Sequence, residues 1–180
     1  EMYDIMGTEL VVLRLKEQLY QNESMSNQES NTDQQNVVPD EVIIPHDCRE
    51  AIIKIMKPTF TLSNGVVMNS RNQIIKAASV IDLTTNVQVA MMMAVVMEVK
   101  AIRPGTKCID FIRALIGIGV LKYSDEKAIK NMADGMNRKL HGSQKKDKKV
   151  PPLPPKHLQW TGTDRNIGDA IYKAMTTKDV

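Results

Sequence analysis

Aromatic residues are scarce in this chain of 180 residues, which contains 4% Phe, Trp and Tyr and a single tryptophan. A surface that stacks the bases of single-stranded nucleic acid needs several aromatic side chains, so the composition argues against a broad platform of that kind. Cysteine is also scarce, because only Cys48 and Cys108 are present and they are far apart. That count argues against a disulfide scaffold and is typical of a reducing compartment. The first residues lack the basic and then apolar pattern of a secretory leader, and we expect an intracellular protein.

A long hydrophobic run is missing as well. The most apolar segment covers residues 87–99 and is interrupted by Gln88 and Glu98. A membrane-spanning helix needs about 20 predominantly apolar residues, so the sequence predicts no contact with a membrane. A helix that is apolar all round usually lies in a core, and we expect this methionine-rich segment to be a core helix. Methionine also lines grooves that accept several partners, and that alternative stays open.

Catalytic and metal-binding signatures are not found in the sequence. There is no Ser/His/Asp set, no phosphate-binding glycine loop and no dinucleotide fingerprint, so we expect no enzyme activity, no catalytic residue and no cofactor. Structural zinc sites usually bring their ligands in two close pairs. Only His46 and Cys48 form such a pair here, whereas Cys108, His141 and His157 are isolated. The sequence therefore predicts no metal site.

Apolar periodicity between Pro45 and Gly142 predicts an all-α domain of about five helices at residues 42–142, without an extended sheet. Helix-start signals occur, in chain order, at Pro45, at Asn69 or Ser70, at Thr84 or Thr85, and at Ser124. We expect Pro104 and Gly105 to end the methionine-rich helix, because proline and glycine interrupt helical backbone. A further apolar segment at 106–122 has an end that is ambiguous between helix and strand.

The chain outside this domain has four parts. They are a leading amphipathic helix at 1–20, a disordered acidic and polar linker at 21–41, a mobile basic, proline-rich arm at 143–158 and a C-terminal helix at 159–180. An isolated helix as short as the leading one is marginal in water, so we predict that it mediates homo-oligomerisation. Thr163 or Asp164 is the expected cap of the last helix, and Trp160 is expected to pin that helix to the domain.

The charge is divided unevenly along the chain. Residues 1–42 carry a net charge of −7 and residues 43–180 a net charge of +10. Such asymmetry favours a polyanion, DNA or RNA, as the partner of the basic part, although a merely solubilising surface would also be basic. The candidate nucleic-acid-binding residues are Arg103, Lys107, Arg138, Lys139, Lys145, Lys146, Lys148 and Lys149. Lysine is a point charge without a fork geometry, so the lysines should contact phosphate rather than read bases.

A family resemblance rests on two stretches, "GVVMNSRNQIIKAASVIDLTTNVQVAMMMAVVMEVKAIRPGTK" and "SDEKAIKNMADGMNRKL". Their order of a helix, a Ser/Thr-rich joint, a long apolar helix, a basic glycine turn and a charged helix resembles the BEN domain, over roughly residues 65–140. That family is an all-helical module of chromatin-associated and some viral proteins. The resemblance implies DNA binding with a sequence preference, transcriptional repression and self-association without enzyme activity. This chain departs from the family in the added segment "CIDFIRALIGIGVLK" and in lacking an aromatic residue near the end of the long helix.

Two functions follow from these patterns. The first is a helical module that binds nucleic acid, DNA above all, in transcriptional or chromatin regulation and with a nuclear location. The second is an assembly adaptor that resembles a viral phosphoprotein, with a self-associating leading helix and a domain that binds another protein. The salt dependence of binding distinguishes the two functions. Binding through phosphate contacts weakens steeply as the salt concentration rises, whereas binding in an apolar groove does not.

Overall fold

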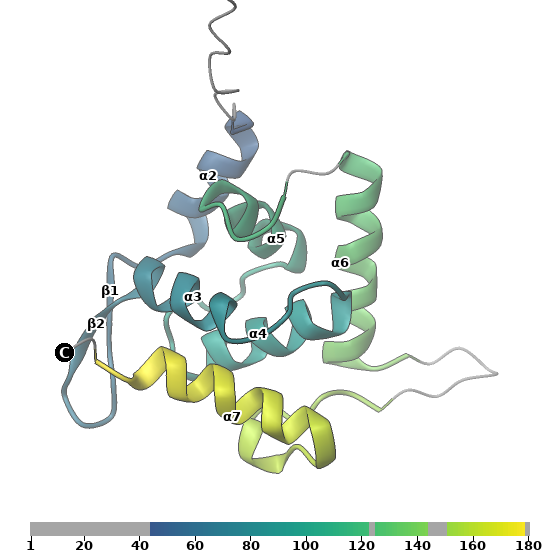
Figure 1. Ribbon diagram of the computed structural model, residues 1–180. Coiled ribbons are helices and arrows are strands. Elements are labelled where there is room, and N and C mark those ends of the chain that lie inside the picture. The colour runs from purple at the N-terminus through teal and green to yellow at the C-terminus, as the bar shows by residue number, and fades with distance from the viewer. Residues whose placement is uncertain (1–43, 123–124, 144–150, 179–180) are drawn as a thin grey trace, which may run out of the picture. The chain divides into compact units, whose positions relative to one another are not determined.

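A computed structural model describes residues 44–122, 125–143 and 151–178 (Figure 1). The chain divides into two units, 1–41 and 42–180, and every described residue belongs to the second. The predicted leading helix at 1–20 and the whole of the predicted linker at 21–41 lie outside the described residues. The second unit contains α2 (His46–Ile55), β1 (Thr59–Thr61), β2 (Val67–Asn69), α3 (Ser70–Ser79), α4 (Asn86–Glu98), α5 (Cys108–Gly117), α6 (Glu126–His141), the short 3₁₀ helix η1 (His157–Gln159) and α7 (Gly162–Thr176). The predicted all-α fold is confirmed, since these elements are helical apart from one small hairpin.

Helix α4 lies at the centre of the unit and packs against α3, α5, α6 and α7. Its buried residues are Val89, Ala90, Met91, Met92, Met93, Val95 and Val96. Thr85 caps the helix: its Oγ1 accepts from Gln88 N at 3.3 Å, and Gln88 Oε1 accepts from Thr85 N at 3.0 Å. The prediction of a core helix is confirmed for most of the methionine-rich segment. Met97 is the exception, because 41% of it is exposed.

The end of α4 was predicted wrongly. The helix ends at Glu98, six residues before Pro104. Lys100 adopts a left-handed backbone with φ of 61°, its N–H donates to Met97 O, and the N–H of Ala101 donates to Val96 O. This pair of bonds satisfies the last carbonyls of the helix and turns the chain away from its axis. The chain then runs beside the end of α2, where Ile102 forms a bridge with Met56.

The turn predicted at Asn64 and Gly65 belongs to a hairpin that the sequence pattern missed. β1 and β2 pair antiparallel, with Phe60 opposite Met68, and both of these side chains are buried. Gly65 has φ of 82°, and Asn64 Oδ1 accepts from Val66 N at 3.2 Å. Strands of three residues are too short to show the alternation by which a strand is recognised.

Two of the predicted helix starts are also corrected. Asp125, not Ser124, caps α6, because Asp125 Oδ1 accepts from Ala128 N at 2.8 Å. Helix α7 begins at Gly162 after Thr161, ahead of the predicted caps Thr163 and Asp164. The ambiguous end of the segment 106–122 is a turn that follows α5, and Gly119 adopts φ of 79° there.

The compact unit extends past residue 142 and includes the proline-rich segment and the C-terminal helix. Residues 144–150 of the predicted arm lie outside the described residues, whereas the part at 151–158 is hydrogen-bonded to the helices at Leu153 and His157. Leu153 N donates to Lys139 O at 3.0 Å, and the indole Nε1 of Trp160 donates to Pro154 O at 2.7 Å. Trp160 is buried, as expected of an anchor. Helix α7, yellow in Figure 1, lies along α3 and α4.

Candidate binding cleft

A cleft of about 880 Å³ lies between α4 and α6. The start of α5 borders it on one side, and the segment 153–155 borders it on another. Its apolar lining is formed by Met93, Ala94, Met97, Ile109, Ala133, Leu140, Leu153, Pro154 and Pro155. Binding sites for small molecules are typically clefts of about 300–1,000 Å³ lined mainly by apolar groups, and this cleft falls within that range.

Cys108 lies in the lining of the cleft, at the first residue of α5. Only 4% of it is exposed, and its Sγ lies 3.1 Å from Asn137 Oδ1 on α6. Burial raises the pKa of the Cys108 thiol above its ordinary value. A thiol with a raised pKa carries less thiolate at neutral pH. The contact of Cys108 with Asn137 joins α5 to α6.

Two lysines lie on the polar border of the cleft. Lys107, which precedes α5, and Lys130, on α6, both line the cleft and are exposed. Helix α5 has no side-chain cap, so the N–H groups of its first turn have no side-chain acceptor at the start of the helix. The start of a helix carries a partial positive charge, which adds to the charge of Lys107.

Two carboxylates, Glu98 and Asp134, also line the cleft. The Glu98 carboxylate is already engaged, because Oε2 accepts from the backbone N–H of His157 at 3.0 Å and lies 2.8 Å from its Nδ1. Asp134 lies on α6 one helical turn from Lys130 and one turn from Arg138, so its charge is flanked by two cations. The lining therefore carries two lysines and two carboxylates.

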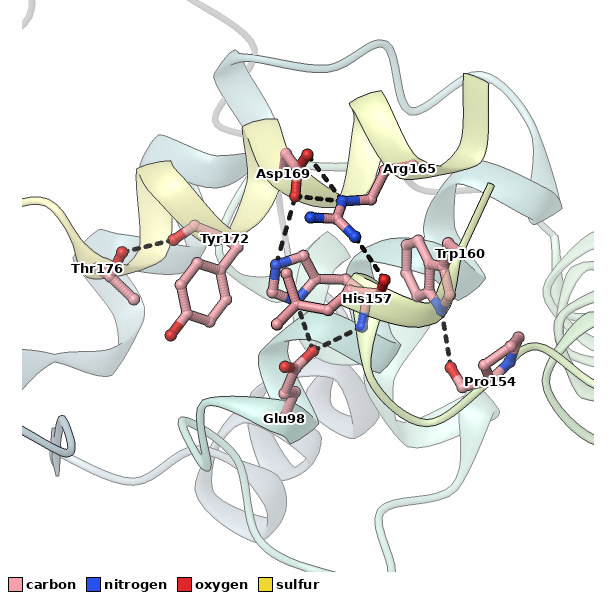
Figure 2. Close-up of polar contacts among 9 residues, drawn as sticks. Glu98, Pro154, His157, Trp160, Arg165, Asp169, Tyr172 and Thr176 are labelled. Carbon is pink, nitrogen blue, oxygen red and sulfur yellow. Dashed lines mark hydrogen bonds and ion pairs between the residues drawn. The ribbon is translucent and has the colours of Figure 1, made fainter. Parts of the chain in front are cut away.

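The wall at 153–155 is held by the polar cluster shown in Figure 2. The imidazole of His157 lies between Glu98 and Asp169, with Nε2 3.5 Å from Asp169 Oδ1, and it stacks on Tyr172 at 4.4 Å between ring centroids. Arg165 Nε donates to both oxygens of Asp169 at 2.8 Å. Only 4% of the His157 side chain is exposed, and each of its ring nitrogens faces a carboxylate. Its role is to attach the proline-rich segment to α4 and α7.

The nucleic-acid-binding residues predicted from the sequence lie in different surroundings. Lys107 lines the cleft, whereas Arg103 is exposed and its backbone N–H donates to Ile55 O at 2.8 Å. Arg138 is exposed on α6. Lys139 is half-buried, and its Nζ lies 2.7 Å from Asp164 Oδ2, which ties α6 to α7. The predicted lysines Lys145, Lys146, Lys148 and Lys149 lie outside the described residues.

Sequence reasoning missed Lys130 and the apolar lining of the cleft. A signal for the α6 side was present, since Lys130, Asp134, Asn137 and His141 follow one another at helical spacings of four, three and four. Nothing in the sequence indicated that α4, the start of α5 and the proline-rich segment would meet this face. That meeting depends on contacts between residues that are far apart in the chain.

Across the described ranges, no helix is long and apolar enough to cross a membrane. Nor do three His, Cys, Asp or Glu side chains come together there in a way that could hold a metal ion. Cys48, one half of the only close ligand pair in the sequence, is fully buried, while His46 is exposed and lies 3.8 Å from Glu50.

Comparison of the chain with protein-family models, with curated proteins and with solved structures gives no match. The resemblance to the BEN domain therefore stays a prediction.

Proposed function

We propose that this protein binds nucleic acid through contacts between its basic surface and phosphate groups. Residues 44–122, 125–143 and 151–178 carry 18 Lys and Arg against 10 Asp and Glu. Several of the carboxylates are used in ion pairs that hold the unit together, such as Lys54 with Asp110 and Arg113 with Asp47 and Glu126. The described residues thus carry eight more cations than carboxylates, which is the electrostatic pattern of a protein that binds a polyanion.

The observation that carries the proposal is that two exposed lysines, Lys107 and Lys130, both line the cleft. Within the described part of the chain, no carboxylate lies within 4 Å of either side-chain nitrogen. In the sequence, the lysine-rich stretch 145–149 lies between His141 and Leu153, two residues that line the cleft.

Contacts of this type position a protein on nucleic acid but do not identify a sequence. Any preference for particular bases would have to come from a helix end or from the turn at 103–107. A role in transcriptional or chromatin regulation, with a nuclear location, belongs to the same proposal and is supported only by the resemblance to the BEN domain.

The test is binding of the full chain to duplex DNA and to RNA over a series of salt concentrations. Replacing Lys145, Lys146, Lys148 and Lys149 by alanine should weaken binding about equally for all sequences. On duplex DNA, the slope of log affinity against log salt should fall by about 0.9 for each lost contact. A matched control replaces four exposed lysines elsewhere, Lys122, Lys127, Lys173 and Lys178, and removes the same charge. Equal losses in the two variants would show an unspecific charge effect and would contradict a defined interface.

The apolar lining of the cleft favours a second candidate function, the assembly adaptor. In that case the wild-type chain would show no salt-dependent binding to any nucleic acid at low ionic strength. The adaptor function also predicts homo-oligomerisation through residues 1–20. Light scattering should then give a multiple of the chain mass for the full chain and a monomer for residues 42–180.

A further inference from the structure

We propose that the proline-rich segment at 151–158 is a docking surface for another protein, one with an aromatic-lined groove bordered by carboxylates, as in an SH3 domain. The surface consists of Pro152, Pro155 and Leu158 with the adjacent Lys156. The inference goes beyond the proposed function, since the ligand is a folded protein domain and not a phosphate group. It depends on the conformation of the segment, on the side that faces the solvent and on the bonds that hold the segment.

The sequence dictates an extended conformation at residues 151–155. The rings of Pro151, Pro152, Pro154 and Pro155 fix φ at about −65°, and a residue that precedes a proline is restricted to extended backbone. Residues 151–154 form neither helix nor strand. These restrictions favour polyproline II, which has three residues per turn and no internal hydrogen bonds. Pro152 and Pro155 therefore share one side of the segment.

A different side of the segment faces the helices. Leu153 lines the cleft, and its N–H donates to Lys139 O on α6. Pro152 is exposed outside the cleft lining, and Pro155 is exposed although it belongs to that lining. Leu158, three residues after Pro155, is 59% exposed despite its large apolar side chain. Exposed apolar side chains that follow one another in this way are typical of an interaction surface.

Hydrogen bonds hold the backbone of the segment in place, and those at Pro154 and His157 are drawn in Figure 2. They run from Leu153 N to Lys139 O, from His157 N to Glu98 Oε2, from Trp160 Nε1 to Pro154 O and from Arg165 Nη1 to Leu158 O. A free peptide loses conformational entropy when it binds, whereas a segment that is already held in place loses less. The folded protein should therefore bind more tightly than a peptide of the same sequence.

The apolar side and the neighbouring charge indicate the chemistry of the partner. Grooves that accept polyproline II segments are lined by aromatic side chains, which pack against proline rings. Lys156 is exposed, and among the described residues no carboxylate lies within 4 Å of its Nζ. A carboxylate at the border of the partner groove would be complementary to this cation. An aromatic groove with an acidic border meets both requirements.

A second copy of this chain does not offer such a groove in its described part. Phe60, Phe111 and Trp160 are buried there, and Tyr172 stacks on the ring of His157. The partner that we infer is therefore a different protein.

The experiment uses a set of purified SH3 domains as probes. A free peptide of residues 150–159 first identifies the domains that bind this sequence, and titration calorimetry then measures their affinity for the full chain. We expect the full chain to bind at least one of these domains, about threefold or more tightly than the peptide, because its segment is already held in place.

Substitutions test which side of the segment binds. Pro152→Ala and Pro155→Ala should each weaken binding by about fivefold or more, as the loss of a central apolar contact does. Leu153→Ala, on the inner side, should weaken it less. Pro58→Ala removes an exposed proline from another part of the unit and is the matched control, which should leave binding unchanged.

Lys156→Gln tests the charge of the surface. It should weaken binding about two- to fivefold and reduce the salt dependence of the affinity, since a charge at the border of an interface acts through solvent. Lys173→Gln, an exposed lysine on α7, is the control for the loss of one charge and should change neither quantity.

Three results would overturn the proposal. The first is that no domain of the set binds the peptide, and the second is that the domains bind the peptide but not the full chain, because the fold would then cover the segment. The third is a larger loss of affinity in Leu153→Ala than in Pro152→Ala and Pro155→Ala, which would place the contact on the inner side.

Discussion

The imidazole Nδ1 of His157 lies 2.8 Å from Oε2 of Glu98, although 59 positions separate the two residues in the chain. The same carboxylate oxygen accepts from the backbone N–H of His157 at 3.0 Å. One glutamate at the end of α4 thus satisfies two donor groups of the proline-rich segment. This contact explains why residues 151–158 pack on the helices, although a proline-rich sequence offers few backbone donors of its own.

The first prediction concerns this contact. Glu98→Ala should lower the free energy of unfolding by about 2 kcal/mol, because it leaves buried donors of His157 without an acceptor. Urea unfolding at neutral pH measures the loss. Glu50→Ala is the control: Glu50 is exposed and lies 3.8 Å from His46, so its removal should cost less than about 0.5 kcal/mol. Equal stabilities for the two variants would mean that the Glu98 contact contributes nothing.

The second prediction concerns the backbone at Lys100. A lysine with φ of 61° is strained, whereas glycine adopts this conformation without cost. Lys100→Gly should therefore raise the free energy of unfolding by up to about 1 kcal/mol, although glycine also gains freedom in the unfolded chain. The carbonyl oxygen of Lys100, which accepts from Lys57 Nζ at 2.9 Å, is kept in the variant.

Lys100→Ala separates the backbone effect from the loss of the lysine side chain. Alanine keeps a Cβ and hence the strain, so this variant should show no gain in thermal unfolding. A gain of the same size in both variants would contradict the backbone argument.

The third prediction concerns the two cysteines and pH. Burial raises the pKa of both thiols, and the nearby Asp47 carboxylate raises the pKa of Cys48 further. A raised pKa means a smaller thiolate fraction at any given pH, and only the thiolate reacts with iodoacetamide. In the folded protein both cysteines should stay unmodified at pH 8, where a free thiol is partly ionised. Mass spectrometry at increasing pH checks this, and rapid modification of either thiol at pH 8 would refute it.

Helix starts were the part of the fold that could be predicted best from the sequence. Thr85 with Gln88, and Asn69 at the start of α3, act through side chains that bond to backbone groups within three residues. Local signals of this kind are present in the sequence itself. The end of α4 could not be predicted, because Lys100 replaces the glycine expected at a left-handed cap.

The candidate site could be predicted only in part. The charge surplus and Lys107 were evident from composition and from a basic turn. The cleft requires that Leu153 return to α6 and that Met97 remain uncovered by α7, and both depend on contacts between distant segments.

The small hairpin at β1 and β2 was missed for a different reason, since three residues are too few to establish a strand pattern.

The last prediction concerns Arg138 and Lys139, which are neighbours in the chain and have different surroundings in the structure. Arg138 and Lys139 were both candidates for phosphate contact. Lys139 Nζ lies 2.7 Å from Asp164 Oδ2, and 22% of its side chain is exposed, whereas Arg138 is exposed and has no carboxylate within 4 Å among the described residues. One of the two residues therefore joins α6 to α7, and the other is available to a ligand.

Lys139→Ala should accordingly lower the free energy of unfolding by about 0.5–1 kcal/mol, a value that allows for screening of a half-exposed pair. It should change nucleic-acid affinity little. Arg138→Ala should leave thermal unfolding unchanged and, on duplex DNA, reduce the slope of log affinity against log salt by about 0.9. Calorimetry measures the stability of each variant, and a salt titration measures its affinity for nucleic acid and the slope of log affinity against log salt. If Lys139→Ala gave the larger loss of affinity at full stability, the ion pair with Asp164 would not hold Lys139 in place, and the two residues would have to exchange roles.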